Sequence, residues 1–108
     1  MSERIAPVFR VTDGKAAAGW YERLGFVVTG EHRFTPELPL YVFLQRSDVH
    51  LHLSEHTGDA RPDTLVHLTV TNLDAVAAEF DAAVRVQPWG RELELTDPDG
   101  NRLRIGQA

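Results

Sequence analysis

The chain has no cysteine among its 108 residues. This absence excludes a disulfide framework, a thiol nucleophile and a thiolate-ligated metal site. The sequence also lacks any apolar run near the roughly 20 residues of a membrane-spanning helix, and residues 1–11 lack the apolar core of a signal peptide. We therefore expect a cytoplasmic protein that has no membrane partner.

Basic residues are also few. Lys and Arg number 11 against 16 Asp and Glu, which gives a net charge of −5. Because nucleic-acid binding needs a basic surface, the composition argues against a nucleic-acid partner. The negative field slightly favours a neutral or cationic ligand. The chain length and the hydrophobic content of 43% predict one domain, residues 1–108, around one core.

The first half of the chain has the pattern of one helix among four strands. Asp13 is the expected N-cap of a helix at residues 15–24, and Gly25 is expected to end that helix in the left-handed conformation. Residues 30–39 contain Phe34 and two prolines and are expected to form a loop. Apolar, β-branched segments predict strands at residues 5–11, 26–29, 40–45 and 49–54.

The same order recurs after a polar, linker-like segment at residues 55–63. Asn72 is the expected N-cap of a helix at residues 73–80, and the halves align without gaps so that Tyr21 matches Phe80. The strands of this half are expected at residues 65–70, 84–86, 91–96 and 102–105. A tandem β-α-β-β-β repeat predicts an α+β fold. We expect two modules, residues 4–56 and 64–107, to form a curved mixed sheet, or cup, with helices on its convex face.

The last two strands form a hairpin with one apolar and one charged face. Leu93 and Leu95 alternate with Glu92 and Glu94, and the turn DPDGN leads into the second strand at residues 102–105. A charged sheet face is usually solvated, and the alternative is the polar wall of a cavity. The sequence leaves both interpretations open.

Several motifs in a fixed order carry a family resemblance. TD at the start of the first helix, WYERLGF at its end, and QPWGRE followed by DPDGNRLRI resemble the vicinal oxygen chelate superfamily, glyoxalase/bleomycin-resistance type. The resemblance spans nearly the whole chain and implies the two-module cup and a homodimer. This scaffold carries lyases, isomerases, dioxygenases, transferases and non-catalytic antibiotic binders, so the function depends on the site.

The resemblance also implies where a metal would bind. Enzymes of this family use His, Glu or Gln from the first and last strands of each module, and these positions here are Ala6, His52, Leu65 and Arg104. Only His52 has a donor atom for a metal, whereas a catalytic metal needs about three protein ligands. We therefore expect no metal, no other cofactor and no catalytic residues. A rearranged ligand set remains an alternative, consisting of His50, His52, His67 and Glu94.

The sequence thus predicts a metal-free binding protein of the bleomycin-resistance type, which sequesters a planar or cationic molecule in a cup or dimer groove, with an antibiotic as one candidate ligand. In the resembling binders, the tryptophan at the position of Trp89 lines the drug groove; here it could instead only anchor its loop. Two alternatives are a lyase or dioxygenase-like metalloenzyme with the rearranged set and a metabolite-binding module without a resistance role. The expected ligand-contacting residues are Phe34, His50, His52, His67, Trp89, Glu94 and Arg104.

Overall fold

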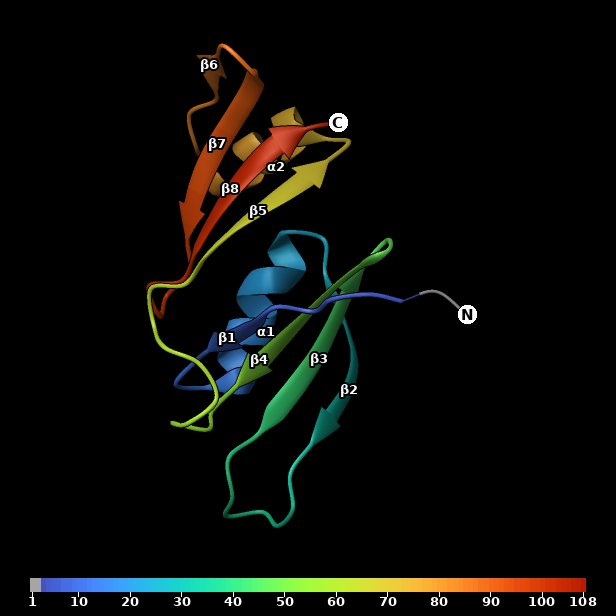
Figure 1. The fold of residues 1–108 in the computed structure, drawn as a ribbon, viewed down its shortest axis with the longest axis vertical. Helices are drawn as coiled ribbons and strands as arrows, with labels where there is room; N and C mark the ends of the chain where they lie inside the picture. The colour runs from blue at the N-terminus through green and yellow to red at the C-terminus, as the bar shows by residue number, and fades with distance from the viewer. Residues whose placement is uncertain (1–2) are drawn as a thin grey trace. The chain divides into compact units, whose positions relative to one another are not determined.

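The chain divides between Pro62 and Asp63 into two units that repeat one order of elements (Figure 1). The computed structural model describes residues 3–108. Each unit is a four-stranded mixed sheet with one helix, which confirms the predicted α+β fold built from tandem β-α-β-β-β modules. Within residues 3–108, neither helix has the length and apolar character needed to cross a membrane.

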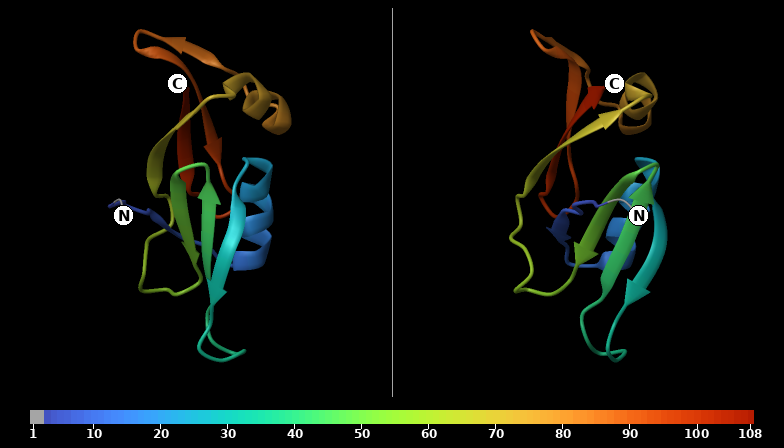
Figure 2. Two further views of the ribbon diagram at one scale, coloured as in Figure 1. Left: turned by 90° about the vertical axis from the view of Figure 1, so that its right-hand side faces the viewer. Right: turned by 45° about the vertical axis from the view of Figure 1, so that its right-hand side comes forward.

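The first unit has the strand order β1-β4-β3-β2. β1 is parallel to β4, and the other neighbours are antiparallel. Helix α1 lies along one face of this sheet (Figures 1 and 2), where Tyr21 is fully buried beside Phe9 and Phe26. The elements are β1 (Val8–Arg10), α1 (Gly14–Arg23), β2 (Val27–His32), β3 (Tyr41–Arg46) and β4 (Val49–Ser54).

The second unit has the matching order β5-β8-β7-β6, with β5 parallel to β8. In its core, Leu73 and Val76 of the helix are buried together with Leu93, Leu95, Leu103 and Ile105 of the hairpin. Phe80, which matches Tyr21 in the sequence repeat, is only half-buried. The elements are β5 (Leu65–Val70), α2 (Leu73–Phe80), β6 (Arg85–Gln87), β7 (Gly90–Thr96) and β8 (Arg102–Gln107).

Two segments differ most from the sequence prediction. The predicted loop at residues 30–39 begins later, because β2 continues to His32. A bulge between Val28 and Gly30 shifts the strand register there, so the alternation that would identify a strand is interrupted. The first strand is shorter than the predicted residues 5–11, and Ile5 lies outside it with 92% of its surface exposed.

The start of the first helix confirms the predicted cap. The Asp13 carboxylate accepts hydrogen bonds from the backbone N–H groups of Lys15 and Ala16, both at 3.1 Å. Gly25 has a φ of 93°, the left-handed conformation expected at the end of this helix. Asn72 stands at the N-cap of α2 as predicted, but its side chain makes no capping hydrogen bond.

A side chain at the end of the last strand, or just after it, accepts a hydrogen bond from the start of each helix. Glu55 Oε2 accepts from the Gly14 N–H at 2.7 Å, and Gln107 Oε1 accepts from the Leu73 N–H at 3.0 Å. Gly14 and Leu73 are the first residues of α1 and α2. Because a helix leaves its first N–H groups without internal partners, these contacts tie each helix to the C-terminal strand of its own unit.

The DPDGN turn is a self-contained structure. Asp97 Oδ1 accepts from the backbone N–H groups of Asp99 and Asn101, each at 2.9 Å, and Gly100 has a φ of 91°. Asp97 and Asn101 are buried. This motif therefore fixes the hairpin that joins β7 to β8 and positions the charged side chains on those strands.

Candidate functional site

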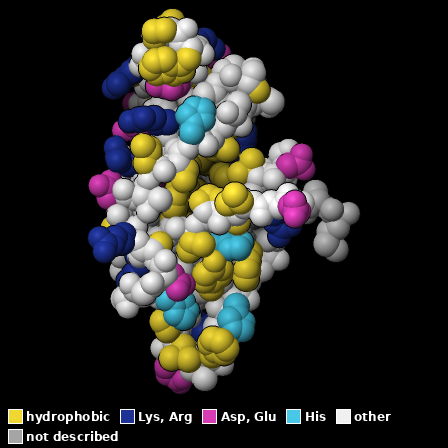
Figure 3. Space-filling model, in the orientation of Figure 1, with side chains coloured by type: hydrophobic (Ala, Val, Ile, Leu, Met, Phe, Trp, Pro, Cys, Tyr) yellow, Lys and Arg dark blue, Asp and Glu magenta, His cyan; other side chains and the backbone are white. Residues whose placement is uncertain are grey.

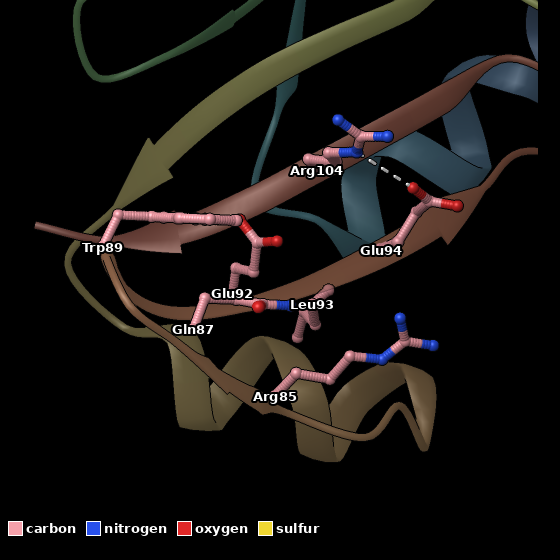
Figure 4. Close-up of a pocket in the computed structure, with 7 residues that line it drawn as sticks. All are labelled: Arg85, Gln87, Trp89, Glu92, Leu93, Glu94 and Arg104. Atoms are coloured by element: carbon pink, nitrogen blue, oxygen red, sulfur yellow. Dashed lines mark hydrogen bonds and ion pairs between the residues drawn. The ribbon is translucent and has the colours of Figure 1, made fainter.

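The helix-free face of the second sheet collects charged side chains from β7 and β8. The strand register sets Glu94 opposite Arg104 and His67 of β5 on the other side of Arg104. Arg104 Nε donates to Glu94 Oε1 at 3.3 Å, as the dashed line in Figure 4 shows. Both side chains are about half exposed, at 50% and 42%. The pair is therefore a surface ion pair that water can reach.

Trp89 projects from the turn between β6 and β7, and its ring extends over Glu92 (Figure 4). Its indole N–H donates to Glu92 Oε2 at 3.0 Å. The side chain is nevertheless 72% exposed, so this hydrogen bond holds the ring in place without burying it. An exposed tryptophan that is held in this way offers its ring face to a planar partner.

These side chains surround a groove that lies within the second unit. Its volume is about 280 Å³, near the lower end of the range for small-molecule sites. Two of the four charged side chains in its lining, Glu94 and Arg104, neutralise each other. The groove is lined by Arg85, Gln87, Trp89, Glu92, Leu93, Glu94 and Arg104.

The helix-free face of the first sheet carries aromatic side chains instead. The register sets Phe43 opposite His52 and Tyr41 opposite Ser54. The Tyr41 hydroxyl lies 2.8 Å from His52 Nδ1, and the two rings meet nearly edge to face. On the face shown in Figure 3, hydrophobic and histidine side chains gather over the strands of the first unit, and arginines gather over those of the second.

Burial shifts the pKa values of this pair in opposite directions. Burial lowers the pKa of His52 below its ordinary value, and the charges of Arg4 and His50 lower it further. Burial raises the pKa of Tyr41, and the negative charge of Asp59 adds to that shift. Both groups are therefore uncharged at neutral pH.

The structure brings together only part of the predicted ligand-contacting set. Trp89, Glu94 and Arg104 line one groove, and His67 is the exposed neighbour of Arg104 on the same sheet. His50 and His52 share one face of β4 in the first unit. Phe34, also in the first unit, packs edge to face on His32 with ring centroids 4.6 Å apart and is 75% exposed.

The strand register also tests whether the implied metal positions fit a metal. Val8, not Ala6, stands opposite His52, and His67, not Leu65, stands opposite Arg104. Each strand pair therefore offers one imidazole beside a side chain that cannot bind a cation. Among residues 3–108, no group of three or more His, Cys, Asp or Glu side chains is placed to hold a metal ion. These residues do not fit the three-ligand centre that a catalytic metal requires.

Several groove and face residues are absent from the predicted set. Arg85, Gln87 and Glu92 line the groove, and Tyr41 and Phe43 surround His52. Glu92 shares the two-residue period of Glu94, so the sequence pattern contains that signal. The pairing of Tyr41 with His52 depends on the register between β3 and β4, which periodicity alone does not give.

Comparison with known proteins identifies relatives over the full length of the chain. The family model described as glyoxalase superfamily protein matches residues 1–108. A crystal structure of a bleomycin-binding protein complexed with bleomycin is similar, with 24% identity, 99% of each chain covered and a TM-score of 0.77.

Two further solved structures are similar over nearly all of both chains. A bleomycin resistance determinant encoded on the transposon Tn5 has 24% identity, 98% coverage of each chain and a TM-score of 0.78. A glyoxalase/bleomycin resistance protein from Streptomyces sp. CB03234 has 26% identity and a TM-score of 0.70, with 95% of this chain and all 100% of that chain covered. A search of curated proteins gave no match.

Proposed function

The chain belongs to the glyoxalase superfamily, and from that membership we propose that it sequesters a planar or cationic small molecule without a metal, in the cytoplasm. Its mechanism is stoichiometric binding by a single domain of residues 1–108. The ligand occupies a cup or dimer groove lined by the residues expected from the sequence, with Trp89 as the main aromatic contact. Similar structures include a bleomycin-binding protein and a bleomycin resistance determinant, which supports an antibiotic as one candidate ligand.

The observation that carries the proposal is the exposed, oriented indole of Trp89. A tryptophan that only anchors its loop would bury its ring, whereas 72% of this side chain is accessible. The hydrogen bond to Glu92 restricts the ring before any ligand arrives, which lowers the entropy lost on binding. Glu92, which bonds the indole, also places a carboxylate beside the ring, where it favours a cationic substituent.

The test begins with a thermal-shift screen of planar and cationic compounds, with and without divalent metals, because a ligand of the native state raises its apparent stability. For the ligand found, Trp89→Ala should weaken binding by about 1–3 kcal/mol, the loss of one stacked ring. Stability should fall much less than the ~3–5 kcal/mol of a buried tryptophan. Titration calorimetry and urea unfolding measure the two quantities.

Two matched variants sharpen this experiment. Trp20→Ala removes the half-buried tryptophan that packs on Tyr21 with ring centroids 4.8 Å apart, so it should lower stability and leave affinity nearly unchanged. Glu92→Gln keeps an acceptor for the indole, whereas Glu92→Leu removes it, so only the second should weaken binding of a neutral planar ligand. Normal binding by folded Trp89→Ala would contradict the proposal.

We further propose that the chain forms a homodimer. Each sheet has two outer strands, and a strand without a neighbour on one side offers backbone groups to a second copy. Light scattering at micromolar concentration should give twice the monomer mass of 12.1 kDa. A monomer mass under these conditions would exclude the dimer and restrict the proposed ligand site to one chain.

A further inference from the structure

Arg85 differs from the other three charged side chains that line the groove beside Trp89. Glu94 is paired with Arg104, and Glu92 accepts a hydrogen bond from the Trp89 indole. The Arg85 side chain has no hydrogen-bond or ion-pair partner within residues 3–108, and no dashed line reaches it in Figure 4. A guanidinium carries five N–H donors, so this one is available to a ligand of the groove.

The strand register places Arg85 on the face that holds the groove. β6 and β7 are antiparallel, and Arg85 stands directly opposite Glu92. Residues opposite each other in such a pair point to the same side of the sheet. Figure 4 shows the Glu92 carboxylate turned toward the indole and the Arg85 guanidinium turned away from it. The groove therefore contains one positive and one negative charge that do not neutralise each other.

These two charges indicate which groups a ligand of the groove should carry. A cationic ring that stacks on Trp89 lies beside the Glu92 carboxylate, but it leaves Arg85 without a counterion. A carboxylate on the ligand matches the planar guanidinium and can accept two parallel hydrogen bonds from it. A dianion such as a phosphate monoester fits less well, because its second negative charge would be repelled by Glu92 and Glu94.

We propose that Arg85 is a specificity-determining residue that binds a carboxylate of the ligand. The ligand is then zwitterionic, with a planar cationic ring on Trp89 and one carboxylate at the Arg85 guanidinium. This inference rests on the proposed function, because Trp89 has to hold the ring in the groove. It adds an anionic group, which neither the net charge of −5 nor the stacking of a planar cation predicts.

A matched pair of probes tests for the carboxylate. 9-Aminoacridine-2-carboxylate and 9-aminoacridine-2-carboxamide share one planar ring that is cationic at pH 7, and they differ in the charge of a substituent of similar shape. In a calorimetric titration of the full chain, the carboxylate should bind roughly three- to ten-fold more tightly, as expected for a partly exposed, charge-assisted contact. The preference should shrink as salt is added, because salt screens exposed charges.

Three variants locate this preference. Arg85→Gln removes the charge and should make the two affinities nearly equal, whereas Arg85→Lys keeps the charge without the planar fork and should retain part of the preference. Arg91→Gln is the matched control. Arg91 pairs with Asp74 of α2, so its substitution makes the same change in net charge outside the groove lining and should preserve the preference.

The outcomes separate this inference from the proposed function. If both probes bind and Trp89→Ala weakens both, but the wild-type chain does not prefer the carboxylate, the proposed function stands and the role of Arg85 is wrong. A preference that survives in Arg85→Gln, or that Arg91→Gln removes equally, would also overturn that role. If Trp89→Ala weakens neither probe, or neither probe binds, the proposed function fails and this inference fails with it.

Discussion

The two units share one topology but present different chemistry on their helix-free faces. In the first unit, His52 is half-buried among rings and is paired with Tyr41. In the second, the matching position is Arg104, which is exposed and paired with Glu94. One face therefore offers an uncharged ring surface and the other a charged groove beside Trp89. The comparison shows that a duplicated scaffold can keep its backbone topology while its two faces carry different side chains.

The helix-covered sides of the two sheets differ less in chemistry than in burial. Tyr21 is fully buried and contacts Phe9 and Phe26, whereas Phe80, the matching residue of the second unit, is half-buried. α1 has 10 residues and α2 has 8, so the second helix has less surface to pack against its sheet. Stability should therefore depend more on the first core than on the second.

The largest expected effect on stability comes from substitutions in the two cores. Tyr21→Ala should lower the free energy of unfolding by about 3–5 kcal/mol, because it removes a fully buried aromatic ring. Phe80→Ala should cost roughly 1–2 kcal/mol, since that side chain is already partly exposed and buries less surface. Urea unfolding of both variants measures the difference. Equal losses would show that the two cores contribute alike.

Substitution of the side chains that bond the helix starts should have an intermediate effect on stability, and its size should differ between the two units. Glu55 uses its two oxygens separately: Oε2 accepts from Gly14 N–H and Oε1 accepts from Leu40 N–H at 2.7 and 2.9 Å. Glu55→Ala leaves both donors without this partner and should cost about 2 kcal/mol. Gln107→Ala loses one acceptor, for Leu73 N–H, and should cost roughly 0.5–1 kcal/mol.

The exchange of carboxylate and carboxamide at these two positions gives the matched control. Glu55→Gln replaces one acceptor oxygen with an NH₂ group that faces a backbone donor, so it should be destabilising. Gln107→Glu keeps the single acceptor that α2 needs and should be nearly neutral. Thermal unfolding of the two variants compares them. A neutral Glu55→Gln would mean that only one of the two N–H contacts contributes.

Local signals explain why so much of the fold was predictable. Asp13 and Gly25 specify the ends of α1 within a few residues of the helix itself. The role of Gln107 was not predictable in this way, because its partner Leu73 lies 34 residues earlier in the chain. The end of β2 at His32 was missed because a bulge breaks the alternation on which strand prediction depends.

The candidate site shows the same limit. The PWG motif identified Trp89, and strand alternation identified Glu94 and Arg104, because each of these signals is local. The bond between Tyr41 and His52 requires the register of two neighbouring strands, so no single segment contains it. The contact between these two side chains was therefore known only from the assembled sheet.

The smallest expected effect is a pH dependence that only the first face should show. His52 has a lowered pKa in the folded chain, so near and below the ordinary value of about 6.5 the unfolded chain binds a proton more readily than the folded one. Stability should then fall as pH decreases from 7.5 to 5.5, and the half-exposed position keeps the change small because water screens the charge. Arg104, at the matching position of the second unit, does not titrate in this range.

Urea unfolding at both pH values should therefore show a smaller loss of stability in His52→Phe than in the wild-type chain. His67→Phe, which removes the exposed histidine of the second unit, should keep the wild-type loss. If His52→Phe kept the full loss, the pH sensitivity would have to come from another group, and the first face would no longer differ from the second in this respect.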